Sequence, residues 1–410
     1  MFFSLWLCNS AAKKLKINMR EQIIHTVDQI ADELLELAKR IFNYRELAFE
    51  EFQSSKALMD YLSRKGFSVE SNTAGLETAF LARYGQGKPH IALLCEYDAL
   101  PEIGHACGHN MIGVIGVGAA VAQVLAGVPE QYPGTITVVG CPAEERGSAK
   151  SDLVKAGVFD DVDAALIIHP SSMSTGFDIA YAIQRYQIEF FGKSAHAAAD
   201  PVQGINALDA MVSFFGGLGL MRQQLAEKTR VHGIIKNGGQ SFNTIPEYTS
   251  AEIGVRALRL DSVKQLAKKV EKLAKGAATM TGCSYQMELL DEMPDVYTNV
   301  PLAEQLDQNY GAVGEEIGER TYEQGAGSTD VGAVTYAVPA IQGYINITAG
   351  EDIATHTREF AEAANSDYGY QAMIRAIKAL ALTSYDLLSD PSLVEQAKQY
   401  FENGERRTVS

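Results

Sequence analysis

Apolar positions recur at two different spacings along the chain, and these spacings predict its helices and strands. From Met19 to Arg45, and again from Ser54 to Lys65, apolar residues recur every three or four positions, as on one face of an amphipathic helix. The chain then alternates short apolar runs, typical of strands, with helical stretches. Strands are expected at residues 68–70, 78–84, 91–94, 134–141 and 164–168, and helices at residues 109–126 and 149–157. Such alternation predicts a mostly parallel sheet.

The spacing changes near Tyr186, where a second pattern begins. Strands are expected at residues 185–192, 231–236, 251–258 and 285–290, and helices at residues 206–225 and 262–281. The order βαββαβ predicts a ferredoxin-like α+β unit in which two helices cover one face of an antiparallel sheet. After Met293 the first pattern returns, with a strand at 340–347 and a long helix at 358–388.

These patterns predict an α/β fold with an insertion. Residues 1–184 and 293–410 are expected to form the larger domain, a mostly parallel sheet with helices on both faces. Residues 185–292 are expected to form the smaller inserted domain. A chain of 410 residues with 46% hydrophobic residues is long enough for two domains with cores of their own.

Charge and cysteine content exclude several classes of partner. The net charge of -16 argues against a nucleic-acid partner, because a phosphate backbone is held mainly by basic patches. No stretch reaches the roughly 20 apolar residues of a membrane span, so no membrane partner is expected. Five scattered cysteines are too few for a disulfide framework, which favours a reducing, cytoplasmic location.

Candidate metal ligands follow the expected strand at 91–94. The stretch IALLCEYDALPEIGHACGHN runs from apolar residues into Asp98, and then into Cys107 and His109 with one glycine between them. A lone Cys-Gly-His is weak evidence, because a free cysteine is often simply buried. The chain has only 8 histidines, however, and two more of them, His169 and His356, lie at or after other expected strands. The carboxyl ends of parallel strands share one edge, so these side chains are expected to converge there.

An acidic pair follows the expected strand at 134–141. Glu144 and Glu145 come directly after it in the sequence CPAEE. Adjacent residues on an extended loop point in different directions, so one can bind a metal while the other moves protons. The alternative is a solvated acidic pair, since glutamate is nearly always exposed. Thiolate, imidazole and carboxylate ligands together suit Zn, Mn or Co.

Several ordered motifs carry a resemblance to a known family. YDALPEIGHACGHN, CPAEE, KSAHAA, NTIP, GAGSTDVG and THTREF together resemble the aminoacylase and glutamate carboxypeptidase family of metal-dependent amidohydrolases, over roughly Glu21 to Leu388. More narrowly, the chain is similar to the branch of p-aminobenzoyl-glutamate hydrolases, indole-acetyl-amino-acid hydrolases and β-alanyl-lysine dipeptidase-like proteins. It departs from many of these relatives at Asn110, where they have aspartate.

The resemblance implies roles for the candidate residues. Cys107 would bridge two divalent cations, with His109 and Glu145 completing one site and two further histidines, His169 and His356, the other. Glu144 would be the general base of amide hydrolysis. Asp98 would orient a metal ligand, as carboxylates commonly do.

The resemblance also implies substrate contacts outside the ligand set. His196, in KSAHAA, would stabilise the tetrahedral intermediate, either in its own chain or, as is frequent in the family, from the partner subunit of a homodimer, and the inserted domain would be a lid or dimerisation domain. On the residues alone, His196 could also be an ordinary histidine near a strand end. Asn243 and Arg256 are candidates for holding a substrate carboxylate, although an ordinary surface salt bridge would also explain Arg256. Gly327 and Ser328 lie in GAGSTDVG, which lacks the lysine of a nucleotide-binding loop and is expected to line the substrate pocket.

The predicted function is hydrolysis of the amide bond of a small N-acyl amino acid or dipeptide-like substrate, such as aminobenzoyl-glutamate or a β-alanyl dipeptide. The reaction would use two divalent cations and an activated water. Two other classes stay open on the residues alone. Cys107 could be the nucleophile of a thiol hydrolase, or the chain could be a non-catalytic binding protein on the same fold.

Overall fold

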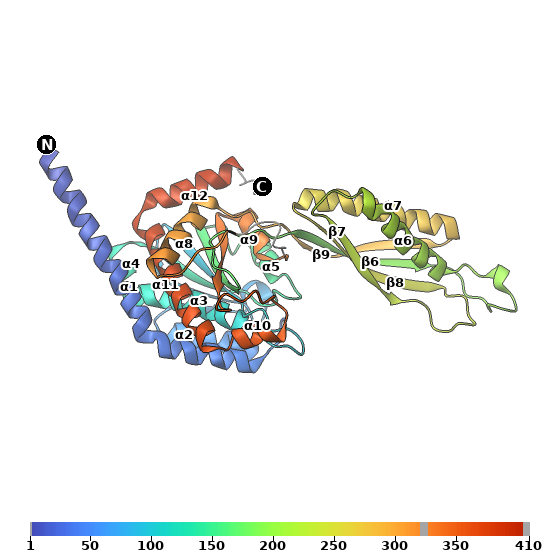
Figure 1. Ribbon diagram of the computed structural model, residues 1–410, viewed down its shortest axis with the longest axis horizontal. Coiled ribbons are helices and arrows are strands. Elements are labelled where there is room, and N and C mark those ends of the chain that lie inside the picture. The colour runs from blue at the N-terminus through green and yellow to red at the C-terminus, as the bar shows by residue number, and fades with distance from the viewer. Residues whose placement is uncertain (1, 320–326, 405–410) are drawn as a thin grey trace. The chain divides into compact units, whose positions relative to one another are not determined.

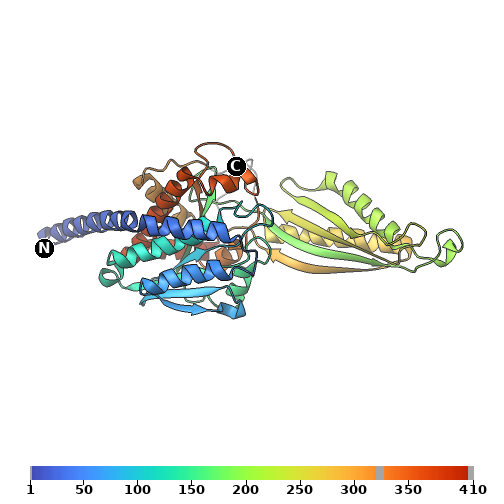
Figure 2. The same ribbon diagram turned by 90° about the horizontal axis from the view of Figure 1, so that it is seen from below.

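The computed structural model describes residues 2–319 and 327–404, which form two compact units (Figures 1 and 2). The second unit comprises Ala180–Val296 and the described residues from 327 to Gly332, and the first comprises the rest. From the sequence, residues 327–332 were expected in the larger domain. Among the described residues, no helix is long and apolar enough to cross a membrane.

The first unit is built on a six-stranded sheet with the order β1-β2-β4-β3-β5-β10. The four strands β4, β3, β5 and β10 run parallel to one another, whereas β1 and β2 form an antiparallel edge. The predicted mostly parallel sheet is therefore confirmed. The strands are β1 (Ser68–Ser71), β2 (Phe80–Gln86), β3 (His90–Cys95), β4 (Gly134–Gly140), β5 (Ala164–Ser171) and β10 (Ala340–Asn346).

The helices that the sequence predicted for the first unit are present, but two of them need correction, and four further helices, α4, α8, α9 and α12, were not predicted. The helix expected at 19–45 begins earlier, and the single helix expected at 358–388 is two helices. The split between α10 and α11 has a physical cause. The side chain of Ser366 accepts a hydrogen bond from the Gly369 N–H and so starts a new helix. The helices are α1 (Phe2–Tyr44), α2 (Phe52–Arg64), α3 (His109–Leu125), α4 (Val128–Gln131), α5 (Ala149–Lys155), α8 (Val300–Ala312), α9 (Val331–Ala337), α10 (Arg358–Ala363), α11 (Asp367–Ser389) and α12 (Pro391–Asn403).

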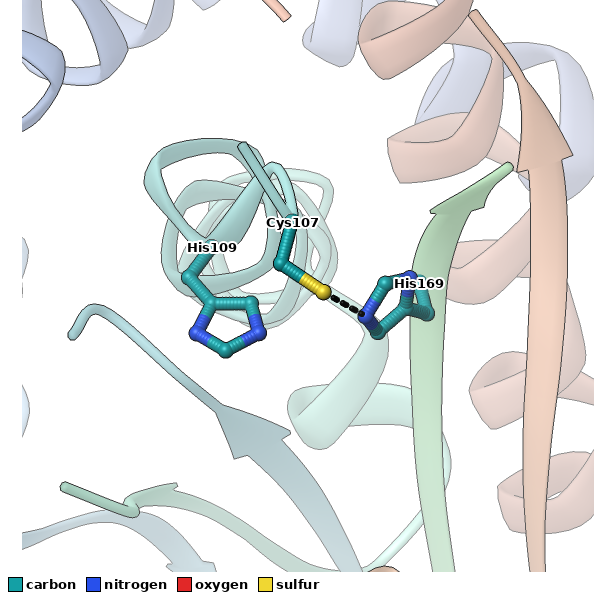
Figure 3. Close-up of side chains that lie close together, drawn as sticks. All are labelled: Cys107, His109 and His169. Atoms are coloured by element: carbon teal, nitrogen blue, oxygen red, sulfur yellow. Dashed lines mark hydrogen bonds between the residues drawn. The ribbon is translucent and has the colours of Figure 1, made fainter. Parts of the chain in front are cut away.

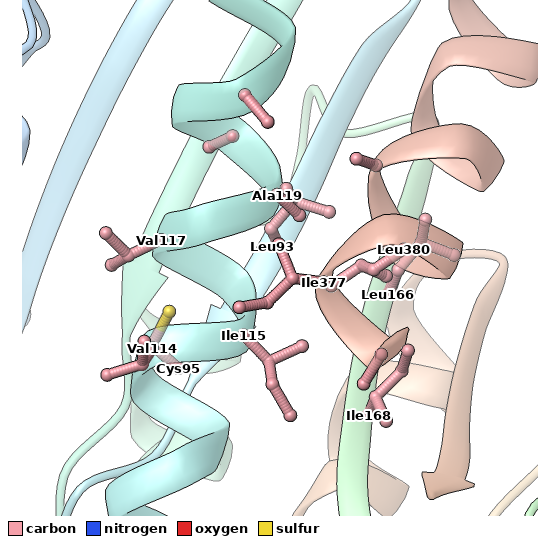
Figure 4. Close-up of a cluster of buried hydrophobic side chains, with 14 of the residues drawn as sticks. Leu93, Cys95, Val114, Ile115, Val117, Ala119, Leu166, Ile168, Ile377 and Leu380 are labelled. Atoms are coloured by element: carbon pink, nitrogen blue, oxygen red, sulfur yellow. The ribbon is translucent and has the colours of Figure 1, made fainter. Parts of the chain in front are cut away.

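Helix α3 lies in the centre of the core, against the sheet and against α1 and α11 (Figure 4). Its glycines permit this packing: a Cβ on Gly116 would lie 2.5 Å from the sulfur of Cys95 on β3. Residues on the other face of the sheet, such as Leu94 and Ile167, are equally buried, as expected for a sheet that is covered on both sides. This packing fixes the first residue of α3, His109, at the carboxyl edge of the sheet.

The second unit has the predicted βαββαβ order, with four antiparallel strands in the order β7-β8-β6-β9. Helices α6 and α7 lie on the same side of this sheet (Figure 1) and share a core with it that includes Ile188, Phe214 and Val270. The ferredoxin-like prediction is therefore confirmed. The elements are β6 (Ala182–Phe191), α6 (Ala207–Met221), β7 (Arg230–Asn237), β8 (Tyr248–Ala257), α7 (Leu260–Thr281) and β9 (Ser284–Met293).

Candidate metal centre

Ligand-type side chains from four segments meet at the carboxyl edge of the first unit's sheet. Cys107 and His109 follow β3, Glu144 and Glu145 follow β4, His169 lies near the end of β5, and His356 follows β10. Their ligand atoms form three groups in which every pair of atoms lies within 4.8 Å. The groups are Cys107 with His109 and His169, Cys107 with Glu145 and His356, and His109 with Glu144 and Glu145.

The turn between Cys107 and His109 depends on Gly108. Its φ is +77°, and a Cβ at this position would lie 2.7 Å from Cγ of Pro170, so only glycine fits without displacing β5. The turn places the Cys107 sulfur 3.4 Å from Nε2 of His169 (Figure 3). Both ligands of the Cys-Gly-His motif are almost completely buried.

Hydrogen bonds on Nδ1 orient both buried histidines. Nδ1 of His109 lies 2.9 Å from Oδ1 of Asp98, and Nδ1 of His169 lies 2.6 Å from the carbonyl oxygen of Pro170. Because these partners are acceptors, each Nδ1 acts as the donor, and in the neutral ring Nε2 then carries the lone pair. The two lone pairs are then available to a cation beside Cys107, which is the arrangement that metal-binding histidines use.

A hydrogen bond to Asp98 fixes the turn after β4 that carries Glu144 and Glu145. Asp98 accepts a hydrogen bond from the Glu145 N–H at 2.9 Å through Oδ2, while its other oxygen holds His109. Oε2 of Glu145 lies 3.4 Å from Nε2 of His356, and Oε2 of Glu144 lies 4.0 Å from Nε2 of His109. Asp98 therefore connects the segment of His109 with that of Glu145 through hydrogen bonds.

His356 has a backbone conformation that is uncommon for a residue other than glycine. Its φ is +64°, and its N–H donates to the carbonyl oxygen of Ala106 at 2.8 Å. Strained backbone of this kind often occurs at functional sites. The contact ties His356 to the residue before Cys107, although half of its side chain stays exposed.

The grouping of the ligands corrects one expectation. The resemblance implied that His109 and Glu145 share one cation with Cys107, and that His169 and His356 share the other. In the structure, His169 joins His109 beside Cys107 and His356 joins Glu145, although His109 also forms a group with Glu144 and Glu145. The reason is that β3 and β5 are neighbouring strands, so the segment after β3 lies beside the end of β5. Among the described residues, no group contains both His169 and His356.

The protonation behaviour of the buried groups separates the chemical alternatives. Burial raises the pKa of the Cys107 thiol, whereas a nucleophilic cysteine needs a lowered pKa. Burial lowers the pKa of His169 to about 4, so this imidazole is neutral at pH 7 and can act as a ligand. The pKa of His356 is raised, mainly because its side chain is hydrogen-bonded to Glu145.

The residues present fit a bound metal. Within the described part of the chain, Nε2 of His109 and Oε1 of Glu145 are buried with no hydrogen-bond partner, which is costly unless a cation binds them. A buried thiol of raised pKa also ionises readily only when a metal or another positive charge lies beside it. Thiolate, imidazole and carboxylate together are a donor set for Zn, Mn or Co.

Sequence reasoning missed two buried residues beside this cluster. The side chain of Lys150 is completely buried, and its Nζ lies 2.6 Å from Oε1 of Glu96, which is also completely buried. The other oxygen of Glu96 lies 3.6 Å from Nε2 of His109. Glu96 lies in the segment EYDALP, but the sequence did not predict its ion pair with Lys150. Lys150 lies among small and polar residues, a pattern typical of an exposed helix start, so the sequence held no signal for its burial.

The candidate substrate residues of the second unit lie at two ends of its sheet. His196 and Asn243 belong to neighbouring loops, joined by a bridge between His196 and Thr244, and Asn243 comes just before β8. Arg256 is the second-last residue of β8, where its guanidinium donates to Oγ of Ser328 at 2.9 Å. Gly327 accepts from the Tyr181 N–H at the same end. Asn243 and Arg256 are therefore not brought together. Gly325 and Ala326 of GAGSTDVG lie outside the described residues.

The Cys107 sulfur belongs to two ligand groups, and the carboxylate of Glu144 lies beside them. This arrangement is typical of a metal-dependent hydrolase. The model of peptidase family M20/M25/M40 matches residues 92–379, and the chain therefore belongs to this family. It is a metallopeptidase of the amidohydrolase type, as the motifs predicted.

Individual relatives agree with this assignment. The chain is 35% identical to the Xaa-Arg dipeptidase of Mus musculus over 96% of this chain and 94% of that protein. It is 31% identical to one of the subunits of the p-aminobenzoyl-glutamate hydrolase of Escherichia coli (strain K12), over 89% of this chain and 91% of that protein. The fold is similar to that of the Bacillus subtilis protein YXEP, described as a dinuclear metal binding peptidase, with a TM-score of 0.66, 19% identity and coverage of 88% and 99%.

Proposed function

We propose that this chain hydrolyses the amide bond of a small dipeptide or N-acyl amino acid with a free carboxylate, at the cluster around Cys107. The observation that carries the proposal is the shared sulfur of Cys107, which belongs to two ligand groups within reach of Glu144. The similarity to an Xaa-Arg dipeptidase makes dipeptides ending in arginine the first candidate substrates. Aminobenzoyl-glutamate is the second candidate, on the similarity to the bacterial hydrolase.

Two divalent cations, Zn, Mn or Co, are part of this proposal. Cys107, His109 and His169 would hold one cation, and Cys107, Glu145 and His356 the other. Such a pair of cations polarises an amide carbonyl and lowers the pKa of the attacking water. The protein contributes the geometry, because Asp98 holds both His109 and the backbone of Glu145.

Glu144 would move the proton. Its carboxylate lies within 4.0 Å of Nε2 of His109, but it belongs to neither group that contains Cys107. A carboxylate beside the ligands, and not itself required as one, can take a proton from water and pass it to the leaving amine. The neighbour of Glu144 points to His356 instead, so the two glutamates have different surroundings.

Arg256 would bind the substrate carboxylate. Its guanidinium already donates to Ser328 through Nη1, and Nε lies 3.2 Å from Nε2 of His232. A planar guanidinium with several donors suits a carboxylate better than any other side chain. Gly327 and Ser328 would line the pocket beside it.

The separation of His196 and Arg256 supports a homodimer, if both residues contact the substrate. His196 lies beside Thr244, which precedes β8, and Arg256 lies at the far end of that strand. Eight residues of strand separate Tyr248 from Arg256, a distance of about 26 Å, which is much longer than a dipeptide. One small substrate therefore cannot contact both residues of one chain. We assign His196 to the site of a partner subunit, where it would stabilise the tetrahedral intermediate.

A cytoplasmic location is also part of the proposal. Cys95, Cys107 and Cys283 are free thiols, as a reducing compartment maintains them.

The test is hydrolysis by metal-reconstituted protein. The purified chain is stripped with a chelator, reloaded separately with Zn, Mn and Co, and assayed for amine release from Xaa-Arg dipeptides, aminobenzoyl-glutamate and indole-acetyl amino acids. We expect hydrolysis of at least one substrate that is lost on chelation and restored by metal. Inhibition by a thiol-alkylating agent with no effect of chelation would instead support the thiol hydrolase, and binding without turnover would support the non-catalytic alternative.

A further inference from the structure

The turn that carries Glu144 and Glu145 begins with a strained residue. Ala143 is completely buried and has a φ of +58°, in the left-handed region that residues with a Cβ avoid. This conformation costs roughly 1–2 kcal/mol for a residue other than glycine, so surrounding contacts must hold it. Because Ala143 comes directly before Glu144, its conformation sets the direction in which both glutamates leave the strand.

One buried carboxylate holds this residue. Oε1 of Glu51, which comes just before α2, accepts the Ala143 N–H at 2.8 Å. Its other oxygen accepts the Thr78 hydroxyl at 2.8 Å. Glu51 and Thr78 are almost completely buried, so water cannot easily replace either bond. Glu51 is 92 residues from Ala143 in the sequence, and no motif connects the two.

Other contacts hold the rest of the turn, whereas the N–H of Ala143 is held by Glu51. The Gly147 N–H donates to the Ala143 carbonyl oxygen at 2.8 Å and closes the turn. The ring of Phe49 packs so closely against Gly147 that a Cβ there would lie 2.3 Å from it. Asp98 holds the Glu145 N–H. The N–H of Ala143 is thus fixed by Glu51, and that of Glu145 by Asp98, one on each side of Glu144.

We propose that Glu51 is a positioning residue for the catalytic turn, because it holds Ala143 in the conformation that aims Glu144 and Glu145 at the metal centre. Glu51 touches neither substrate nor ligand and acts only through the backbone of Ala143. The proposal rests on the proposed function, which makes Glu145 a ligand and Glu144 the general base. It adds α2 and the segment of Thr78 to the parts of the fold on which activity depends.

Three substitutions at Glu51 test the proposal. Glu51→Gln keeps an oxygen for the Ala143 N–H and an amide group for Thr78, so it should keep kcat within about threefold. Glu51→Ala removes both bonds, and Glu51→Asp keeps a carboxyl group on a side chain that is one carbon shorter. A misplacement of about 1 Å can cost 10²-fold in rate, and we expect a loss of that order in kcat for Glu51→Ala, with KM little changed.

Metal content gives a second readout that does not depend on activity. Glu51 acts on the turn of Glu145 but makes no contact with Cys107, His109 or His169. After dialysis against a weak chelator, Glu51→Ala should therefore keep about one metal equivalent where the parent keeps two, as Glu145→Gln should. Hydrogen exchange in the peptide that contains Ala143 should also accelerate in Glu51→Ala and stay slow in Glu51→Gln.

Asp163 provides a matched control. It is a buried carboxylate that accepts a backbone N–H, that of His90 at 2.7 Å, but at the start of β3, the opposite end of the strand from the metal centre. Asp163→Asn should lower stability without changing kcat or metal content. If Glu51→Ala does not fold, Glu51→Asp replaces it.

The outcomes distinguish the positioning role of Glu51 from the ligand role of Glu145. If the folded variant loses no more kcat and metal than Asp163→Asn, Glu51 is merely structural and the positioning proposal is overturned. If Glu145→Gln also keeps two metals, the ligand assignment fails instead. Loss of one metal and of kcat in Glu51→Ala, with recovery in Glu51→Gln, supports the proposal.

Discussion

Lys150 and Glu96 form an ion pair that is completely shielded from solvent, with Nζ 2.6 Å from Oε1. Burial opposes ionisation of Glu96, but Lys150, followed by His109 and His169, lowers the pKa of Glu96 below its ordinary value. Two buried charges are costly unless each compensates the other, and here Lys150 compensates Glu96. Glu96 also lies 3.6 Å from Nε2 of His109, so the ion pair directly adjoins the metal centre.

Breaking this pair should be strongly destabilising. Lys150→Met leaves the carboxylate of Glu96 buried and uncompensated, and we expect a loss of about 3–5 kcal/mol in the free energy of unfolding. Adding Glu96→Gln removes the unpaired charge and should recover part of that loss. Urea denaturation of the two single variants and the double variant measures the coupling. Strictly additive effects would show that the two charges do not interact.

Glu144 and Glu145 should differ in what their substitution removes. Glu144→Gln should keep two metals but lose about 10²–10⁴ in kcat, the usual contribution of general acid–base catalysis. Glu145→Gln should lose metal, because its carboxylate belongs to the group with Cys107 and His356. Elemental analysis beside steady-state kinetics separates the two effects, and the opposite pattern would exchange the two assignments.

Cys107 should matter for both cations, because its sulfur belongs to both groups. Cys107→Ala should lower the occupancy of both sites without unfolding the chain, since it removes only one buried sulfur. His169→Ala should affect one site alone. Metal content after equal dialysis, with circular dichroism as the folding control, checks this difference. Equal losses in the two variants would contradict the sharing of Cys107.

Glu51 should make the stability of the first unit depend on pH. Burial and the nearby charge of Asp98 raise the pKa of Glu51 to about 7, whereas it is 4.5 in an unperturbed carboxyl. A raised folded-state pKa contributes stability that is fully present below pH 4.5 and is lost as the pH rises through about 7. The shift corresponds to a difference on the order of 3 kcal/mol. Glu51→Gln, which does not titrate, should remove this fall in urea midpoints between pH 4.5 and about 7. An unchanged pH profile in Glu51→Gln would disprove the assignment.

His196 should complement Glu144 across a dimer. If Glu144→Gln and His196→Ala chains are unfolded and refolded together, random pairing makes about half of the dimers mixed. Each mixed dimer then holds one site with both defects and one with neither, so about a quarter of wild-type activity should return. If His196 acts in its own chain, every site keeps one defect and the mixture stays inactive. Labelled subunits verify the exchange.

Local patterns in the sequence were sufficient to predict the strands, most of the longer helices and the edge at which the site forms, but not α8, α9 or α12. Apolar runs fix strands and helices through short-range spacing, and the ends of parallel strands necessarily share one edge of a sheet. Cys107, Glu144, His169 and His356 could therefore be expected to meet, because each follows or ends such a strand. The motifs in addition predicted the family of metal-dependent amidohydrolases.

Which of these residues face one another depends on contacts between distant parts of the chain. His169 lies beside His109 because β3 and β5 are neighbours, an order that no local spacing encodes. Lys150 and Glu51 look in the sequence like ordinary surface charges, yet each is buried by segments that are distant along the chain. Side-chain direction and burial depend on such long-range contacts, whereas helices, strands and their polarity depend mainly on neighbouring residues. The sequence therefore determined which residues could be metal ligands. Only the tertiary structure determined which of these residues face one another and which buried side chains hold them in place.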